Sequence, residues 1–155
     1  MIEQKTLIGR AEMIEFPEIA LENIPARIDT GAKTSSLWAS HIEEKDGKLH
    51  VLFLDAPDDA EKVVFDSFDV RPVASSNGHV QRRYVVTTLV VLAGRKVRAE
   101  FTLADRSLQV YPVLIGRNVL RDKFIVDVAQ GGALRYKDRV RSPAIQSHIN
   151  NKEEQ

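Results

Sequence analysis

Turn signals recur along this chain about every eight to twelve residues, and they separate short segments in which apolar and polar side chains alternate. The clearest example is Asp46-Gly47, a typical hairpin turn, which precedes the alternating segment 48–54. Alternation of this kind has the period of a β-strand, so the pattern predicts strands rather than helices. The predicted strands cover residues 5–14, 24–29, 48–54, 62–70, 82–92, 97–103, 111–115 and 124–128, with further turns at 75–78 and 93–96.

About eight to ten short strands with tight turns indicate an all-β sandwich or barrel. Pro72 is expected to end the strand that begins at residue 62. The one predicted helix, over residues 118–123, follows Gly116-Arg117 and has Asn118 as its candidate N-cap. No repeat or long linker divides the chain, so we expect one domain over residues 1–141 and a polar, flexible tail over 142–155.

Composition excludes several classes of protein. The 155 residues include no cysteine, which rules out disulfides, thiolate metal sites and a cysteine nucleophile. Basic and acidic residues balance at 22 each, unlike a highly basic nucleic-acid binder. The N-terminus lacks the apolar segment of a secretory signal, and no apolar run is long enough to span a bilayer. We therefore expect a cytoplasmic protein without nucleic-acid or membrane partners.

The zero net charge hides an uneven distribution. Residues 1–70 carry 7 basic and 15 acidic side chains, whereas residues 71–123 carry 10 basic and 3 acidic ones. One interpretation is that the two regions attract each other across the molecule. The other is that the basic region lines a groove for an acidic ligand.

Two segments carry the pattern most indicative of chemistry. An apolar strand leads into Asp29-Thr30-Gly31-Ala32, and a second apolar strand leads into Gly116-Arg117-Asn118 about 85 residues later. Taken alone, the first segment is consistent with an Asx-turn, in which Asp29 accepts a hydrogen bond from its own backbone. The second segment, in this order and at this spacing, makes the pair far more specific.

The paired segments resemble those of retropepsins, which are aspartic peptidases. More closely, the chain resembles a bacterial retropepsin-like family that is often labelled ATP-dependent zinc proteases and is associated with a ribosomal-protein glutamate ligase. The resemblance implies a closed β-barrel of the acid-protease type with one short helix. The matching segments are residues 26–37 (ARIDTGAKTSSL), 78–85 and 103–128.

The resemblance implies that Asp29 is catalytic. Aspartic peptidases use two carboxylates that share one proton, and this chain has a single Asp-Thr-Gly. A two-fold homodimer would supply the second Asp29. The loop would be supported by residues that resemble the family pattern: Thr30, Gly31, Ala32, Gly116, Arg117 and Asn118.

The chain departs from retroviral enzymes at two places. Residues 33–36 are Lys-Thr-Ser-Ser, so they offer Arg117 no acidic partner. The candidate flap, residues 75–84, is charged rather than apolar, which suits an acidic peptide or a plain solvent-exposed hairpin. Its candidate substrate-binding residues are Gly78, His79, Arg82 and Arg83, and Arg117 is a further candidate to contact an acidic peptide.

The zinc and ATP labels find no support in the sequence. His41, His50, His79 and His148 are dispersed and form no His-Glu-x-x-His motif, although His79 and Asp105 could contribute to a site built from distant residues. There is no phosphate-binding Gly-x-x-x-x-Gly-Lys-Ser/Thr loop either, so we expect no cofactor and no metal.

The leading hypothesis is a homodimeric retropepsin-like aspartic peptidase that acts on acidic, glutamate-rich peptides or protein tails. The alternative is a non-catalytic module on the same barrel that binds an acidic peptide or a partner enzyme. A metal-dependent peptidase or amidase is a third, weaker option. Asp127 is the first candidate for a second carboxylate within the chain, or else bonds a turn or Arg117, and Trp38 is expected in the core or at a pocket edge.

Overall fold

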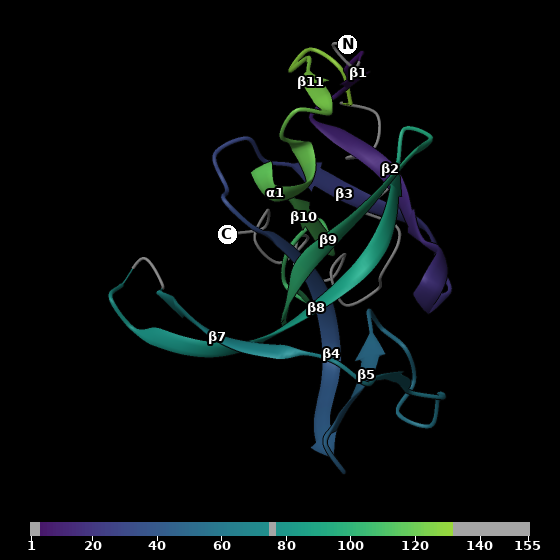
Figure 1. Ribbon diagram of the computed structural model, residues 1–155, viewed down its shortest axis with the longest axis vertical. Coiled ribbons are helices and arrows are strands. Elements are labelled where there is room, and N and C mark those ends of the chain that lie inside the picture. The colour runs from purple at the N-terminus through teal and green to yellow at the C-terminus, as the bar shows by residue number, and fades with distance from the viewer. Residues whose placement is uncertain (1–3, 75–76, 132–155) are drawn as a thin grey trace, which may run out of the picture.

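The computed structural model describes residues 4–74 and 77–131, and within them nearly all the regular secondary structure is β-strand (Figure 1). The elements are β1 (Thr6–Ile8), β2 (Ala11–Phe16), the 3-10 helix η1 (Pro17–Ile19), β3 (Leu21–Ile28), β4 (Ser35–Lys45), β5 (Lys48–Phe53), β6 (Val63–Phe65), β7 (Asp69–Ala74), β8 (Val80–Leu92), β9 (Arg95–Ala104), β10 (Val113–Ile115), the short helix α1 (Arg117–Leu120) and β11 (Phe124–Val126).

Six strands close into a ring in the order β10-β3-β2-β8-β9-β4. The ring closes because β10 pairs on one side with β3, in parallel, and on the other with β4, antiparallel. Outside the ring, β5 and β6 continue from β4, β7 pairs with β8, and β1 pairs in parallel with β11. The predicted fold, an all-β closed barrel of the acid-protease type with one short helix, is confirmed.

The barrel interior is filled by the apolar side chains that alternate along the strands. On β9, Val97, Ala99, Phe101 and Leu103 are buried, as the alternation predicts. Phe101 packs edge-to-face against Phe16 of β2, with ring centroids 5.1 Å apart. Each large apolar side chain that is fully buried in this way contributes roughly 1.5–3 kcal/mol.

Two of the predicted turns have the backbone that their sequences favour. Asp46 and Gly47 join β4 to β5 with φ of 56° and 75°, and Ala93 and Gly94 join β8 to β9 with φ of 50° and 77°. Two consecutive residues with positive φ form the hairpin turn that matches the twist of the flanking strands.

Several predicted strand boundaries are wrong. The segment 5–14 is two strands, because β1 pairs with β11 in a separate sheet whereas β2 pairs with β3 and β8 in the barrel. The segment 62–70 divides into β6 and β7. Pro72 lies inside β7 rather than ending a strand, because β7 pairs only with β8 and an edge strand tolerates a missing N–H.

The predicted helix 118–123 is shorter and begins earlier, since α1 covers Arg117–Leu120 and its N-cap is Gly116. Asn118 is therefore inside the helix instead of capping it. None of the described helices is long and apolar enough to cross a membrane. The predicted tail, residues 142–155, lies outside the described residues.

Candidate active site

The Asp29 loop begins where β3 leaves the barrel. The backbone N–H of Asp29 donates to the carbonyl oxygen of Ile115 on β10 at 2.8 Å. The N–H of Gly31 donates to Oδ1 of Asp29 at 2.9 Å, and the N–H of Ala32 donates to the Asp29 carbonyl at 3.2 Å. These bonds hold the half-buried Asp29 side chain at the surface, next to an exposed Thr30.

Gly116 lies against the far side of this loop. A Cβ built on Gly116 would lie 2.2 Å from the carbonyl oxygen of Thr34 and 2.9 Å from that of Ala32. The N–H of Arg117 donates to the Ala32 carbonyl at 2.8 Å. The two predicted segments are therefore in direct contact, and only glycine fits at the crossing point.

A side-chain network fixes this crossing, and sequence reasoning did not find its central residue, Ser35. The Ser35 hydroxyl donates to Oδ1 of Asn118 at 2.6 Å and accepts from the Gly116 N–H at 2.9 Å. The Asn118 Nδ2 in turn donates to the carbonyl oxygen of Glu100 at 2.9 Å. The available signal was a small hydroxyl residue directly before the apolar run of β4.

Arg117 and Asp127 have separate partners. The Arg117 Nη1 donates to the carbonyl oxygen of Thr30 at 3.2 Å, so it supports the loop through the backbone rather than through a carboxylate. The Asp127 carboxylate accepts from the Ala129 N–H at 2.9 Å and from the Gln130 Nε2 at 3.1 Å. These bonds make Asp127 a turn residue, one of the roles that the sequence left open.

The flap candidates lie on the hairpin of β7 and β8, which extends away from the barrel (Figure 1). We call residues 69–85, apart from the undescribed 75–76, the charged hairpin. Gly78 has a φ of 83° in its turn, His79 and Arg82 are exposed, and Arg83 is half-buried. Both arginines line a pocket of about 390 Å³ that also includes His41 and Asp105.

The described residues contain no group of three or more His, Asp or Glu side chains able to hold a metal ion. His79 is exposed at the hairpin turn, and His148 lies outside the described residues. Trp38 is 5% exposed and therefore buried, but it points to the opposite face of β4 from Leu37 and Ala39, which join the main hydrophobic cluster.

The acidic and basic regions of the sequence do pair with each other in part. Arg98 donates to both carboxylate oxygens of Glu18, at 3.0 and 2.8 Å, and these bonds hold the pKa of Glu18 below its ordinary value. Within the basic region itself, Arg71 forms a bidentate pair with Glu100 and lowers the pKa of that carboxyl. This pair joins the charged hairpin to β9.

Two apolar features lie at the β1–β11 pair. Leu7 and Ile125, which pair across these strands, are 56% and 55% exposed, and Val128 is 75% exposed. Phe124 and Val126 point to the other face of β11. They border a pocket of about 730 Å³ together with Leu120, Thr30, Asn118 and four charged residues, Lys33, Arg117, Arg121 and Asp122. Exposed apolar area of this kind is typical of interaction surfaces.

A closed six-stranded barrel with an Asp-Thr-Gly loop packed against an Ile-Gly-Arg-Asn turn defines a retropepsin-like protein. The chain belongs to the RimB-like family: the family model described as "Retropepsin-like aspartic endopeptidase RimB" matches residues 7–133. The resemblance inferred from the motifs is thereby confirmed.

Two curated relatives are named as glutamate ligases rather than as peptidases. A protein of Shewanella halifaxensis named "Probable alpha-L-glutamate ligase" is 32% identical over 90% of this chain, and one of Desulfotalea psychrophila with the same name is 35% identical over 84%. The matched segments are only 32% and 30% of those proteins, so the chain spans about a third of their length.

A solved structure also matches closely. The Legionella pneumophila protein Lpg0085, described as having unknown function, is 27% identical, with a TM-score of 0.64 over 82% of this chain and 96% of that one. The barrel described above is therefore shared with an experimentally determined fold.

Proposed function

We propose that the chain is an aspartic endopeptidase that acts as a homodimer on acidic, glutamate-rich peptides or protein tails. The observation that carries the proposal is the Asp29 loop, which is held by Gly116 in a barrel of a family described as aspartic endopeptidases. The relatives named as glutamate ligases support the acidic substrate, because the product of such a ligase carries added glutamates.

The proposed mechanism uses one Asp29 from each of two chains. Two carboxylates at hydrogen-bonding distance cannot both ionise, so they share a proton. The ionised carboxylate takes a proton from water as the water oxygen attacks the scissile carbonyl carbon, while the protonated one donates to the carbonyl oxygen. Collapse of the tetrahedral intermediate breaks the C–N bond, and the leaving nitrogen takes a proton from the pair.

Apolar side chains near the loop support the dimer. The pocket bordered by Thr30 is lined in part by Leu120, Phe124 and Val126, and Leu7, Ile125 and Val128 are exposed on or next to the β1–β11 pair. A second copy that covered these side chains would bury apolar area and bring its own Asp29 loop to the same region.

The test compares wild type with Asp29→Asn and with Asp127→Asn as a matched control, using oligoglutamate and mass spectrometry of the products. We expect Asp29→Asn to lose at least about 10²-fold in cleavage rate, because an amide cannot share the proton. Asp127→Asn should keep activity, because among the described residues the Asp127 carboxylate bonds only within its own turn. Unchanged cleavage by Asp29→Asn would refute the mechanism. Binding without cleavage by wild type would favour the non-catalytic module.

A further inference from the structure

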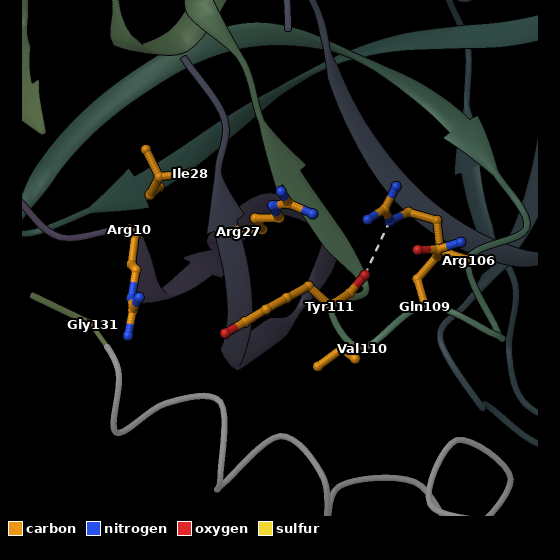
Figure 2. A pocket seen from close by; sticks show the side chains of 8 residues that line it. All are labelled: Arg10, Arg27, Ile28, Arg106, Gln109, Val110, Tyr111 and Gly131. Atoms are coloured by element: carbon orange, nitrogen blue, oxygen red, sulfur yellow. Dashed lines mark hydrogen bonds between the residues drawn. The ribbon is translucent and has the colours of Figure 1, made fainter. Parts of the chain in front are cut away.

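A pocket of about 410 Å³ opens beside the end of β3, immediately before the Asp29 loop (Figure 2). This volume is within the range of small-ligand sites in proteins. The pocket is separate from the one that contains Arg82 and Arg83. Its lining residues are Arg10, Arg27, Ile28, Arg106, Gln109, Val110, Tyr111 and Gly131.

The pocket is strongly basic. Three of its lining residues are arginines, and no Asp or Glu is among the described residues that line it. Arginine remains protonated at neutral pH, so Arg10, Arg27 and Arg106 place three positive charges around one hollow. Figure 2 shows them on different sides of the pocket, with Arg27 between the other two. A hollow of this kind attracts an anion.

Arg106 is the most enclosed of the three. Its Nε donates to the carbonyl oxygen of Tyr111 at 3.0 Å, a bond that fixes the plane of the guanidinium (Figure 2). Burial lowers the pKa of Arg106, and the positive charges of Arg27 and Arg83 lower it further. Arg83 is on the charged hairpin, so a positive charge of the hairpin repels Arg106, which lines the pocket. A bound carboxylate would relieve the repulsion among these cations.

The position of the pocket ties it to the candidate catalytic carboxylate. Arg27 precedes Asp29 by two residues, which is about 7 Å along an extended strand. A peptide bound in extended form advances by the same distance per residue. A side chain one or two positions from the bond beside Asp29 is therefore within reach of the pocket.

We propose that the pocket of Arg10, Arg27 and Arg106 binds the side-chain carboxylate of an acidic residue close to the bond that is cleaved. The proposal rests on the proposed function, and it adds Arg10, Arg27 and Arg106 to Arg82 and Arg83 as residues that recognise an acidic substrate. The planar guanidinium can hold a carboxylate through two parallel hydrogen bonds, which makes arginine suited to this task.

The experiment measures binding rather than cleavage. Labelled oligoglutamate and oligoglutamine of equal length are titrated by fluorescence anisotropy against Asp29→Asn protein, which keeps the pocket intact. Arg10→Gln, Arg27→Gln and Arg106→Gln are added singly in that background. Lys96→Gln is the control, because it removes the same charge from an exposed position on β9 that does not line the pocket.

We expect oligoglutamate to bind at least about tenfold more tightly than oligoglutamine, because hydrogen bonds to charged groups are among the strongest in proteins. Each arginine variant should weaken oligoglutamate binding by about tenfold, with the control within about twofold. Arg10 and Arg27 are exposed, so their variants test the pocket even if Arg106→Gln fails to fold.

Three results would overturn the proposal: equal affinity for the two peptides, unchanged affinity in Arg10→Gln and Arg27→Gln, or competition by inorganic phosphate as effective as that by oligoglutamate. The last would make the pocket a general anion site. A failure of the proposed function gives a different result. If wild type binds oligoglutamate through these arginines but does not cleave it, the proposed function is refuted and the proposed binding site is not.

Discussion

The Asp29 loop and the charged hairpin are built in opposite ways. The loop is fixed by backbone hydrogen bonds to β10 and by the crossing at Gly116, which leaves no room for a methyl group. The charged hairpin extends from the barrel with one strand, β7, paired only to β8, and its side chains are mostly exposed. The Arg71–Glu100 pair is a side-chain link from this hairpin to β9 of the barrel.

The difference suggests that the loop suits catalysis and the hairpin suits recognition. A catalytic carboxylate must be held within a fraction of an ångström, and close packing of backbone against backbone provides that. Recognition of an acidic chain needs charge and reach, which exposed arginines on a hairpin provide at little cost in stability. Substitutions in the loop should therefore affect folding and chemistry, whereas those in the hairpin should affect affinity.

The largest effect is expected at the crossing. Gly116→Ala would place a methyl carbon 2.2 Å from a backbone oxygen, so the two segments would have to separate. We expect the free energy of unfolding, measured by urea denaturation, to fall by about 1–3 kcal/mol or more. The control is Gly78→Asn in the hairpin turn, where a Cβ meets nothing within 4 Å and asparagine tolerates the positive φ. An equal loss in both variants would show that the two regions are equally constrained.

A somewhat smaller effect is expected at Ser35. Its hydroxyl accepts from the Gly116 N–H, and Ser35→Ala leaves that buried donor without a partner at a cost of about 1–3 kcal/mol. The neighbouring Ser36 is the matched control, because its buried Oγ has no hydrogen-bond partner among the described residues. Thermal unfolding of both variants measures the difference, and Ser36→Ala should be neutral or stabilising. If Ser36→Ala is the more damaging change, the network does not hold the crossing.

Substitutions in the charged hairpin should change the affinity for oligoglutamate but not the stability of the fold. Arg82→Ala/Arg83→Ala is expected to weaken oligoglutamate binding by about threefold to tenfold, because exposed ion pairs contribute little individually. The effect should shrink as salt is raised, and the unfolding temperature should stay unchanged. Calorimetric titration at two salt concentrations measures the first effect, and a thermal scan measures the second. No loss of affinity would leave these arginines paired only with the protein's own acidic residues.

The smallest effect is expected at the Arg71–Glu100 pair, which joins the charged hairpin to β9. The hydrogen bonds from Arg71 hold the pKa of Glu100 below its ordinary value of 4.5, so the pair stabilises the fold above that pH. The contribution is lost as the pH falls through the lowered pKa. Wild type should therefore be slightly more stable than Glu100→Gln at neutral pH, and the difference should shrink as the pH falls below 4.5. A difference that grows on acidification would have the wrong sign for this pair.

Sequence reasoning found the barrel and the two segments of the candidate site because both depend on local signals. Alternation predicted the buried face of β9, and Gly116 preceded a recognisable turn. It missed β4, whose polar start and charged end hide the apolar residues between them, although β4 closes the ring. It also missed the pocket of Arg10, Arg27 and Arg106, because these arginines are far apart in sequence and only the fold brings them together.

A mixing experiment tests most directly whether two copies of Asp29 form one site. Wild type is mixed with increasing amounts of Asp29→Asn protein, allowed to exchange subunits, and assayed for cleavage of oligoglutamate per wild-type chain. If each site needs an Asp29 from both chains, activity per wild-type chain falls to about half in an equal mixture and to about one tenth in a ninefold excess. Activity that stays constant per wild-type chain would show that a single chain contains the whole site, and would contradict the shared dimeric site.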